Sequence, residues 1–205
     1  DVRAPQTWKR VLKDVQVVFH QAAEVGVGQS MYEIVRYMDA NTMGTALMWQ
    51  ELITGRYQVR KVLVASSMSI YGEGAYRCET HGTVYPSLRV DEQLATRDWE
   101  MRCPRCHATV QWEPTPEEKP LMPTSVYAIS KRDQEELCLS LGRAYKIPTV
   151  ALRYFNIYGP RQSLSNPYTG VAAIFSSRLL NRKAPVIFED GGQSRDFIHV
   201  RDIVR

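Results

Sequence analysis

Three short runs rich in β-branched residues, separated by longer stretches of helical periodicity, constrain the fold of this chain most strongly. Runs of this length and composition predict buried strands, and the stretches between them predict helices. Such alternation is typical of an α/β fold with a parallel sheet. The predicted strands are residues 15–19, 61–65 and 148–152, and the predicted helices cover about residues 32–54 and 125–145.

The residues that follow each predicted strand are the first candidates for chemistry, because ligands of parallel sheets bind beyond the carboxyl ends of the strands. Residues 20–23 follow the first strand, and residues 153–156 follow the third. Ser66 and Ser67 follow the second strand, where we predict a turn. These three segments should meet at one edge of the sheet.

Composition excludes several classes of protein. The chain has 205 residues, 44% hydrophobic and 23% charged, which fits a folded globular protein. No apolar run approaches the roughly 18 residues needed to span a bilayer. The net charge of +4 is too small to indicate a nucleic-acid surface. We therefore expect neither a membrane nor a nucleic acid as partner, and a cytoplasmic location.

Ser67, Tyr127 and Lys131 form the central chemical pattern. Tyr127 and Lys131 are four residues apart in a predicted helix and so share one face. A nearby ammonium favours the phenolate and lowers the tyrosine pKa, and a hydroxyl such as Ser67 can hold the oxygen whose proton the tyrosine exchanges. A Tyr-x-x-x-Lys pair alone is more often a solvated pair. Its position after a strand that ends in two serines favours an acid–base site.

With these residues and three longer segments, the sequence resembles the extended short-chain dehydrogenase/reductases that act on nucleotide sugars, the NAD-dependent epimerase/dehydratase family. The resemblance covers nearly the whole chain outside residues 73–123. It is carried by residues 64–72 (VASSMSIYG), 152–160 (LRYFNIYGP) and 194–202 (SRDFIHVRD). It implies a Rossmann-like parallel sheet with helices on both faces, bound NAD, a nucleoside-diphosphate sugar as partner, and a homodimer.

The resemblance also divides the chain. Residues 1–72 and 124–165 would form a partial dinucleotide-binding domain, 73–123 an insertion, and 166–205 part of the sugar-nucleotide lobe. The family's glycine-rich loop is absent, since Gly26-Val27-Gly28 follows the wrong strand and position 31 is Met. We therefore expect a chain truncated at both ends, lacking the first strands and inactive by itself.

The resemblance assigns site residues individually. The catalytic residues would be Ser67, Tyr127 and Lys131. The cofactor contacts would be Asp1, Val2, Gln21, Ala22, Ala23, Asn41, Ala65, Ser66, Tyr127, Lys131, Tyr154 and Phe155. The substrate contacts would be Ser67, Asn156, Val186, Phe188 and Arg195. A guanidinium at Arg195 suits the diphosphate, because it can bind that anion through two parallel hydrogen bonds.

The residues after Ser67 bear on the type of reaction. Dehydratases of this family carry an Asp-Glu pair there, whereas this chain has Met68 and Ser69. Our first hypothesis is therefore 4-epimerisation through a transient 4-keto sugar, with a rhamnose-type deoxy sugar among the candidate substrates. An NAD(P)-dependent nucleotide-sugar reductase or dehydrogenase is the second hypothesis, and a non-catalytic zinc-bearing fragment the third. The sequence leaves open the sugar, the nucleotide, and the choice between NAD and NADP.

Residues 73–123 break the alternation, with six prolines and no sustained periodicity. Cys78 with His81, and Cys103 with Cys106, give two ligand pairs whose spacing suits a tetrahedral metal ion. Zinc would stabilise a segment that has almost no core, so we predict a zinc-ribbon-like insertion with a structural zinc. Free surface or redox cysteines are the alternative, and His107 is a competing ligand.

Overall fold

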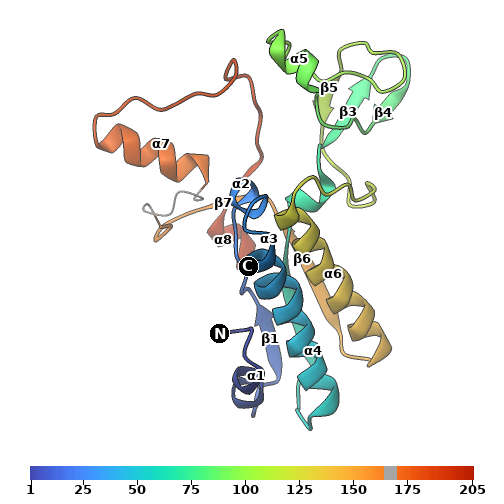
Figure 1. The fold of residues 1–205 in the computed structure, drawn as a ribbon, viewed down its shortest axis with the longest axis vertical. Coiled ribbons are helices and arrows are strands. Elements are labelled where there is room, and N and C mark those ends of the chain that lie inside the picture. Colours follow the sequence, from blue (N-terminus) through green and yellow to red (C-terminus); the bar gives the residue numbers. More distant parts are fainter. Residues whose placement is uncertain (164–169) are drawn as a thin grey trace. The chain divides into compact units, whose positions relative to one another are not determined.

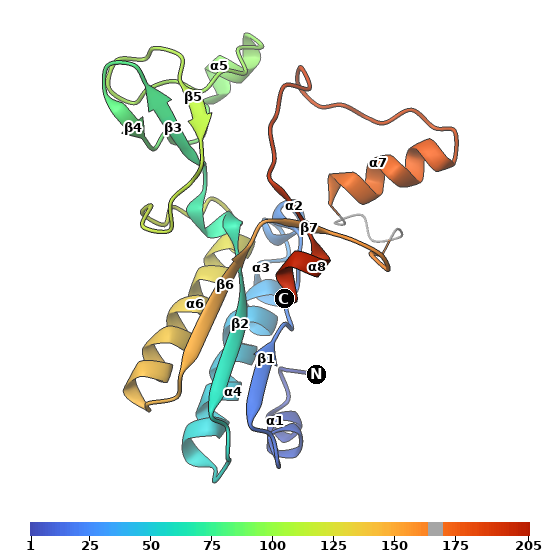
Figure 2. The same ribbon diagram turned by 180° about the vertical axis from the view of Figure 1, so that it is seen from behind.

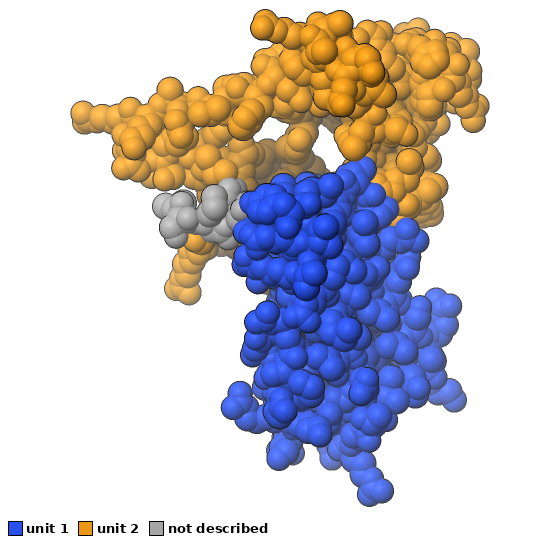
Figure 3. Space-filling view, in the orientation of Figure 1, with its two compact units in different colours: residues 1–70, 123–154 blue, residues 71–122, 155–205 orange. Residues whose placement is uncertain are grey.

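A computed structural model of the chain describes residues 1–163 and 170–205. The chain forms two compact units, coloured separately in Figure 3. The first contains residues 1–70 and 123–154, and the second contains residues 71–122 and 155–205. The first unit ends at residue 154; the boundary that the sequence analysis places at residue 165 lies outside the described residues.

The first unit contains a three-stranded parallel sheet in the order β1-β2-β6. Its strands are β1 (Val17–His20), β2 (Lys61–Ser67) and β6 (Thr149–Tyr154). Strand β2 runs two residues further than predicted, because Ser66 and Ser67 continue the parallel ladder opposite Arg153 and Tyr154. The predicted turn at the two serines is therefore wrong, and the chain turns only in the 3₁₀ segment η2 (Met68–Tyr71).

Helices α4 (Gly44–Thr54) and α6 (Val126–Ala144) cover one face of this sheet (Figures 1 and 2). The prediction of helices on both faces is not met in the described part of the first unit. The reason is the strand order: two right-handed crossovers that advance in the same direction pass over the same face.

Strand β1 lies at the edge of the sheet and is only half buried. Val18 and His20 face the helices, whereas Val17 is 41% exposed and Phe19 is 64% exposed. Alternate side chains of a strand point to opposite faces, and the second face carries no helix of the first unit. The prediction of a buried strand is wrong for this face.

The hydrophobic core lies between the sheet and its helices, which include α1 (Pro5–Val11). Trp49 is fully buried at its centre, and its indole N–H donates to the Cys138 sulfur at 3.1 Å. The buried members of this core are Trp8, Leu12, Met48, Trp49, Leu52, Val62, Val64 and Cys138.

The predicted helix over residues 32–54 forms, but not as one regular α-helix. It consists of α3 (Ile34–Tyr37), the π-helical segment η1 (Met38–Met43) and α4, after a short α2 (Val27–Ser30). The widened turn contains Asn41, whose buried side chain bonds to groups outside the helix. By contrast, α6 matches its prediction and begins at Ser125, whose hydroxyl accepts from the Ala128 N–H at 3.1 Å.

In the second unit, residues 71–122 form a small module. Strands β3 (Ala75–Cys78), β4 (Gly82–Val84) and β5 (Gln111–Glu113) make an antiparallel sheet in the order β4-β3-β5. Helix α5 (Asp91–Ala95) lies between β4 and β5 along the chain. Gly82 has φ +68°, which the tight β3–β4 turn requires. The buried hydrophobic cluster of this module consists of Cys78, Val84, Cys103 and Val110.

Lys119 joins the two ends of this module. Its side chain is buried, and its ammonium donates to the carbonyl oxygens of Tyr71 at 2.7 Å and Pro120 at 3.2 Å. It also lies 5.2 Å from the centre of the Tyr85 ring. The chain therefore leaves the module close to where it entered.

The rest of the second unit pairs β7 (Asn156–Tyr158) in parallel with β8 (Phe197–His199), and includes α7 (Val171–Leu180) and α8 (Val200–Ile203). Arg89 of the module makes a bidentate ion pair with Glu189, at 2.8 and 2.9 Å. Across the described ranges, no helix has both the length and the apolar character that crossing a membrane requires.

Candidate active site

Ser67, Tyr127 and Lys131 all belong to the first unit, at the carboxyl end of the parallel sheet. Ser67 is the last residue of β2, and its Oγ accepts from the Ser69 N–H at 3.1 Å. Tyr127 and Lys131 lie in the first two turns of α6. The Tyr127 backbone N–H donates to Ser30 Oγ at 3.0 Å, which fixes the start of the helix against α2.

The tyrosine does not have the lowered pKa that the sequence analysis expects. Burial raises the pKa of Tyr127, and the nearby Ser67 hydroxyl acts in the opposite direction. The ammonium of Lys131 instead donates to Gln134 Oε1 at 2.6 Å. Lys131 thus follows Tyr127 on the same helix, but its direct partner is one turn further on.

Lys131 is buried, with 3% of its surface exposed. Burial lowers its pKa to about 8, because a charged ammonium loses solvation there. Gln134 links Lys131 to Thr45, since its Nε2 donates a hydrogen bond to Thr45 Oγ1 at 2.9 Å. Sequence reasoning missed Gln134, although its spacing of three residues from Lys131 on a helix could have indicated the contact.

His20 completes this buried network. Thr45 Oγ1 donates its proton to the Asn41 carbonyl at 2.6 Å and lies 2.8 Å from His20 Nε2, which is also 3.3 Å from Gln134 Nε2. Burial, together with the charge of Lys131, lowers the pKa of His20 to about 4, so the ring is neutral at pH 7.

Asn41 supports the site from behind. Its Oδ1 accepts from the Glu24 N–H at 2.7 Å, and its Nδ2 donates to the Glu24 carbonyl and to Ser130 Oγ, at 3.1 and 2.9 Å. Both amide protons are therefore used within the protein, and the side chain is fully buried. In this structure Asn41 positions helix α6 through Ser130, and its contact with the cofactor stays a prediction.

Ser66 offers a test of whether a cofactor fits at this edge. Its Oγ is buried without a hydrogen-bond partner in the part of the chain that the structure describes. A buried hydroxyl with no partner costs free energy, so a ligand group at this position would satisfy it. Ala22 and Ala23 follow β1 at the same carboxyl edge, where small side chains leave room for a ligand. The residues present therefore fit a cofactor.

The remaining expected cofactor residues are distributed as follows. Asp1 is exposed and pairs with Arg3 at 2.6 Å, and Gln21 is also exposed. Ala65 is buried in β2, and the backbone carbonyl of Val2 accepts from the Trp8 indole N–H. Tyr154 ends β6, and Phe155 is the first residue of the second segment of the second unit, residues 155–205.

The expected substrate residues, apart from Ser67, belong to the second unit. Asn156 begins β7, and its Nδ2 donates to the Asp196 carbonyl at 3.0 Å. Arg195 is exposed, and Val186 and Phe188 are exposed at 49% and 74%. The structure thus collects Ser67, Tyr127 and Lys131 in one unit and the remaining substrate residues in the second.

The four predicted metal ligands come together in the second unit. Cys78 ends β3, His81 precedes β4, and Cys103 and Cys106 flank a separate turn. Cys78 Sγ lies 3.6 Å from His81 Nδ1 and 3.7 Å from Cys106 Sγ, and Cys103 Sγ lies 3.5 Å from His81 Nδ1. All four ligand atoms lie within 4.8 Å of one another, and His107 is not in this cluster.

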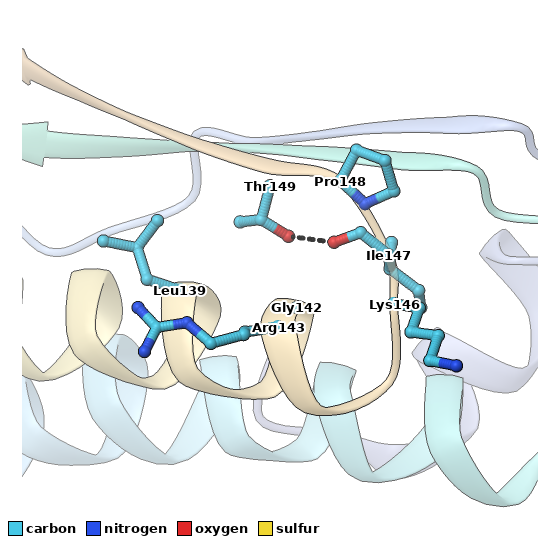
Figure 4. Close-up of a pocket in the computed structure, with 7 residues that line it drawn as sticks. All are labelled: Leu139, Gly142, Arg143, Lys146, Ile147, Pro148 and Thr149. Atoms are coloured by element: carbon cyan, nitrogen blue, oxygen red, sulfur yellow. Dashed lines mark hydrogen bonds between the residues drawn. The ribbon is translucent and has the colours of Figure 1, made fainter.

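A hollow at the far end of α6 is a separate feature (Figure 4). It lies where α6 ends and β6 begins, at the amino end of the strands, away from Ser67. Inside it the Thr149 hydroxyl donates to the Ile147 carbonyl at 2.9 Å. Its lining residues are Leu139, Gly142, Arg143, Lys146, Ile147, Pro148 and Thr149.

The parallel sheet and its helices agree with comparisons to known proteins. The sequence matches the profile of the NAD dependent epimerase/dehydratase family over residues 1–89 and 104–205. The chain belongs to this family. The unmatched residues 90–103 lie inside the module that carries the four clustered ligands.

Individual relatives are similar over almost the whole chain. A dTDP-L-rhamnose 4-epimerase of Burkholderia thailandensis is 36% identical over 99% of this chain and 55% of its own length. The structure of UDP-glucose 4-epimerase from Thermotoga maritima with UDP-glucose is 28% identical, with a TM-score of 0.75, and covers 100% of this chain and 55% of that one. The Thermus thermophilus UDP-glucose 4-epimerase complex with NAD is 28% identical, with a TM-score of 0.71, and covers 99% and 56%.

These family members are longer proteins. The chain spans about half the length of the curated relatives it matches. They include nucleotide-sugar 4-epimerases and a dehydratase, so the comparisons confirm the family and the Rossmann-like fold.

Proposed function

We propose that this chain supplies the acid–base centre of an NAD-dependent epimerase that inverts C4 of a nucleoside-diphosphate sugar through a transient 4-keto sugar. One observation carries the proposal: Ser67 and the buried Tyr127 phenol lie together, with Lys131 one helical turn further along α6. The similarity to nucleotide-sugar 4-epimerases supports the same reaction class.

The chain's own residues have distinct tasks in this reaction. Tyr127 takes the proton of the sugar's C4 hydroxyl and later returns it, and Ser67 donates a hydrogen bond to the developing ketone oxygen. Bound NAD would accept the hydride from C4 and return it to the opposite face, and its cationic oxidised ring would favour the phenolate whose pKa burial raises. Lys131, held by Gln134, keeps further N–H groups for the cofactor and adds positive charge.

Ser66, Ala22 and Ala23 would hold the cofactor, and Asn41 would hold helix α6 in place behind it. For the substrate, we propose Asn156, Val186, Phe188 and Arg195 in the second unit, with Arg195 binding the diphosphate. A rhamnose-type deoxy sugar is the first candidate to test, since the relative at 36% identity is a dTDP-L-rhamnose 4-epimerase.

Epimerisation is favoured over dehydration by the residues beside Ser67. Met68 and Ser69 occupy η2, where the resemblance to the family implies Asp and Glu in a dehydratase. A thioether cannot donate or accept the proton that β-elimination needs, and a serine hydroxyl is a poor acid at neutral pH. A dehydrated keto-product would contradict this assignment.

The test uses the intact protein with a panel of nucleoside-diphosphate hexoses and deoxyhexoses. Tyr127→Phe should lower kcat by about 10²–10⁴-fold, because it removes the acid–base group. NAD retained by the purified protein should stay near the wild-type amount. Tyr145→Phe, at the exposed end of the same helix, is the control and should keep wild-type turnover. Full activity of Tyr127→Phe would overturn the proposal.

The alternative is a nucleotide-sugar reductase or dehydrogenase built on the same three residues. It differs by net turnover of the nicotinamide, which absorbance of NADH or NADPH measures directly. Epimerisation predicts a changed C4 configuration with no net change in NADH. Stoichiometric NADH or NAD(P)⁺ formation would select the alternative.

A further inference from the structure

We propose that Cys78, His81, Cys103 and Cys106 bind one Zn²⁺ ion, which holds the module of residues 71–122 together. The proposal is independent of the epimerase reaction. The four residues belong to the second unit, not to the unit that carries Ser67 and Tyr127.

The distances match the edges of a tetrahedral zinc site. With Zn–S near 2.3 Å and Zn–N near 2.0–2.1 Å, tetrahedral angles place two sulfurs about 3.8 Å apart, and a sulfur and a nitrogen about 3.5 Å apart. The observed sulfur–sulfur distance between Cys78 and Cys106 is 3.7 Å, and the two sulfur–Nδ1 distances are 3.6 and 3.5 Å. Three of the six ligand–ligand distances thus have the length that one tetrahedral ion requires, and all four ligand atoms lie within 4.8 Å of one another.

The backbone presents the ligands in two opposed turns. Cys78 and His81 flank the β3–β4 turn. Cys103 and Cys106 flank a turn closed by hydrogen bonds from the His107 N–H to the Cys103 carbonyl, at 2.9 Å, and from the Cys103 N–H to the Ala108 carbonyl, at 2.8 Å. Backbone hydrogen bonds of this kind fix the ligands before the ion arrives, and two short turns joined by one ion are typical of structural zinc sites.

The core of the module explains why it needs an ion. Only four residues form its buried cluster, and two of them, Cys78 and Cys103, are proposed ligands. A sheet of three strands with so little apolar burial is marginally stable alone. An ion that crosslinks both turns would supply the missing stability.

A disulfide, a redox pair of cysteines and a catalytic zinc each fit the cluster less well than a structural ion. A disulfide needs sulfurs about 2.05 Å apart, and all three cysteines are unpaired. Redox chemistry with two adjacent cysteines would not require His81 Nδ1 at 3.5–3.6 Å from two sulfurs. A catalytic zinc would keep an open coordination position, whereas four protein ligands close the site.

The experiment measures metal content and protection of the module in the full-length protein. Elemental analysis of wild type should find about one zinc per chain. His81→Asn removes a ligand and should lower that content at least about tenfold. His107→Asn is the matched control: this exposed histidine lies outside the cluster and has φ 59°, which asparagine tolerates. It should keep wild-type zinc.

A second measurement protects the test against variants that fail to fold. Wild-type protein stripped with a chelator should be cut by trypsin within residues 71–122 on the order of ten times faster than untreated protein, while residues 123–154 stay protected. Re-addition of Zn²⁺ alone should restore the slow rate. Wild type without zinc, equal zinc loss in both histidine variants, or cleavage unchanged by chelation would each overturn the proposal. None of these results depends on epimerase activity.

Discussion

The buried ammonium of Lys131 makes a prediction about stability that the catalytic role does not. Its pKa falls from 10.5 to about 8 in the folded protein because burial disfavours the charge. At about 1.4 kcal/mol per pKa unit, the charged lysine costs the fold about 3 kcal/mol at pH 7. Lys131→Met keeps the length of the side chain and removes the charge. The substitution should therefore raise the free energy of unfolding by that cost, reduced by a constant amount for the lost hydrogen bond to Gln134.

The sign follows from proton counting. Between the folded pKa near 8 and the unfolded pKa near 10.5, the unfolded state binds more protons, so raising the pH stabilises wild type. The methionine variant has no such dependence. The difference in free energy of unfolding, variant minus wild type, should therefore fall by about 2–3 kcal/mol between pH 7 and pH 10.

Urea denaturation of both proteins at pH 7 and pH 10 measures this change, and the constant loss of the Gln134 bond cancels in it. Lys13→Met is the control, because Lys13 is exposed and has no buried charge to relieve. A difference between Lys131→Met and wild type that stays the same at the two pH values would refute the reasoning. It would mean that water or another group solvates the ammonium of Lys131.

Three further predictions concern Asn41, Arg89 and Phe19. Asn41→Ala should lower the free energy of unfolding by about 1–3 kcal/mol in urea titrations, because Glu24 and Ser130 lose buried partners; a neutral effect would contradict its role in positioning α6. Arg89 holds Glu189, the residue next to 186–188, so if those residues contact the sugar nucleotide, Arg89→Ala should raise KM several-fold at unchanged kcat. Steady-state kinetics measures both constants, and a fall in kcat alone would argue against this prediction. Phe19→Lys should reduce self-association of this 205-residue chain, measured by sedimentation velocity, because a charge on the exposed edge strand opposes its pairing with a second chain. Unchanged association would locate the contact between chains elsewhere.

The fold could be predicted where the sequence pattern is local. The strand runs and the Ser125 start of α6 are set by β-branched residues and by a capping hydroxyl, and both can be recognised in the sequence. The exposed face of β1 could not be predicted, because a β-branched run looks the same at an edge as in the centre of a sheet. The faces of the sheet that helices cover depend on strand order, which the local sequence pattern does not indicate.

The site divides in the same way. Tyr127, Lys131 and the two ligand pairs follow from spacing along the chain, which a helix or a tight turn converts into proximity. The His20–Thr45–Gln134 contacts join three separate elements, so nothing in the local sequence indicates them. The raised pKa of Tyr127 could not be foreseen either, because it comes from the burial of the phenol, which is known only from the structure.

The contact of Lys119 with the Tyr71 carbonyl has a consequence for the entropy of folding. About 60 residues separate Ser67 from Tyr127 along the chain, but the contact at 2.7 Å shortens the effective path to about 12. Since the entropy of closing a loop grows with the logarithm of its length, this shortcut is worth about 1.4 kcal/mol toward bringing the serine and the tyrosine together. For the unit that carries Ser67 and Tyr127, a folded module with joined ends thus behaves like a short connection. The number of residues inside the module can change with almost no effect on the entropy of bringing these two residues together.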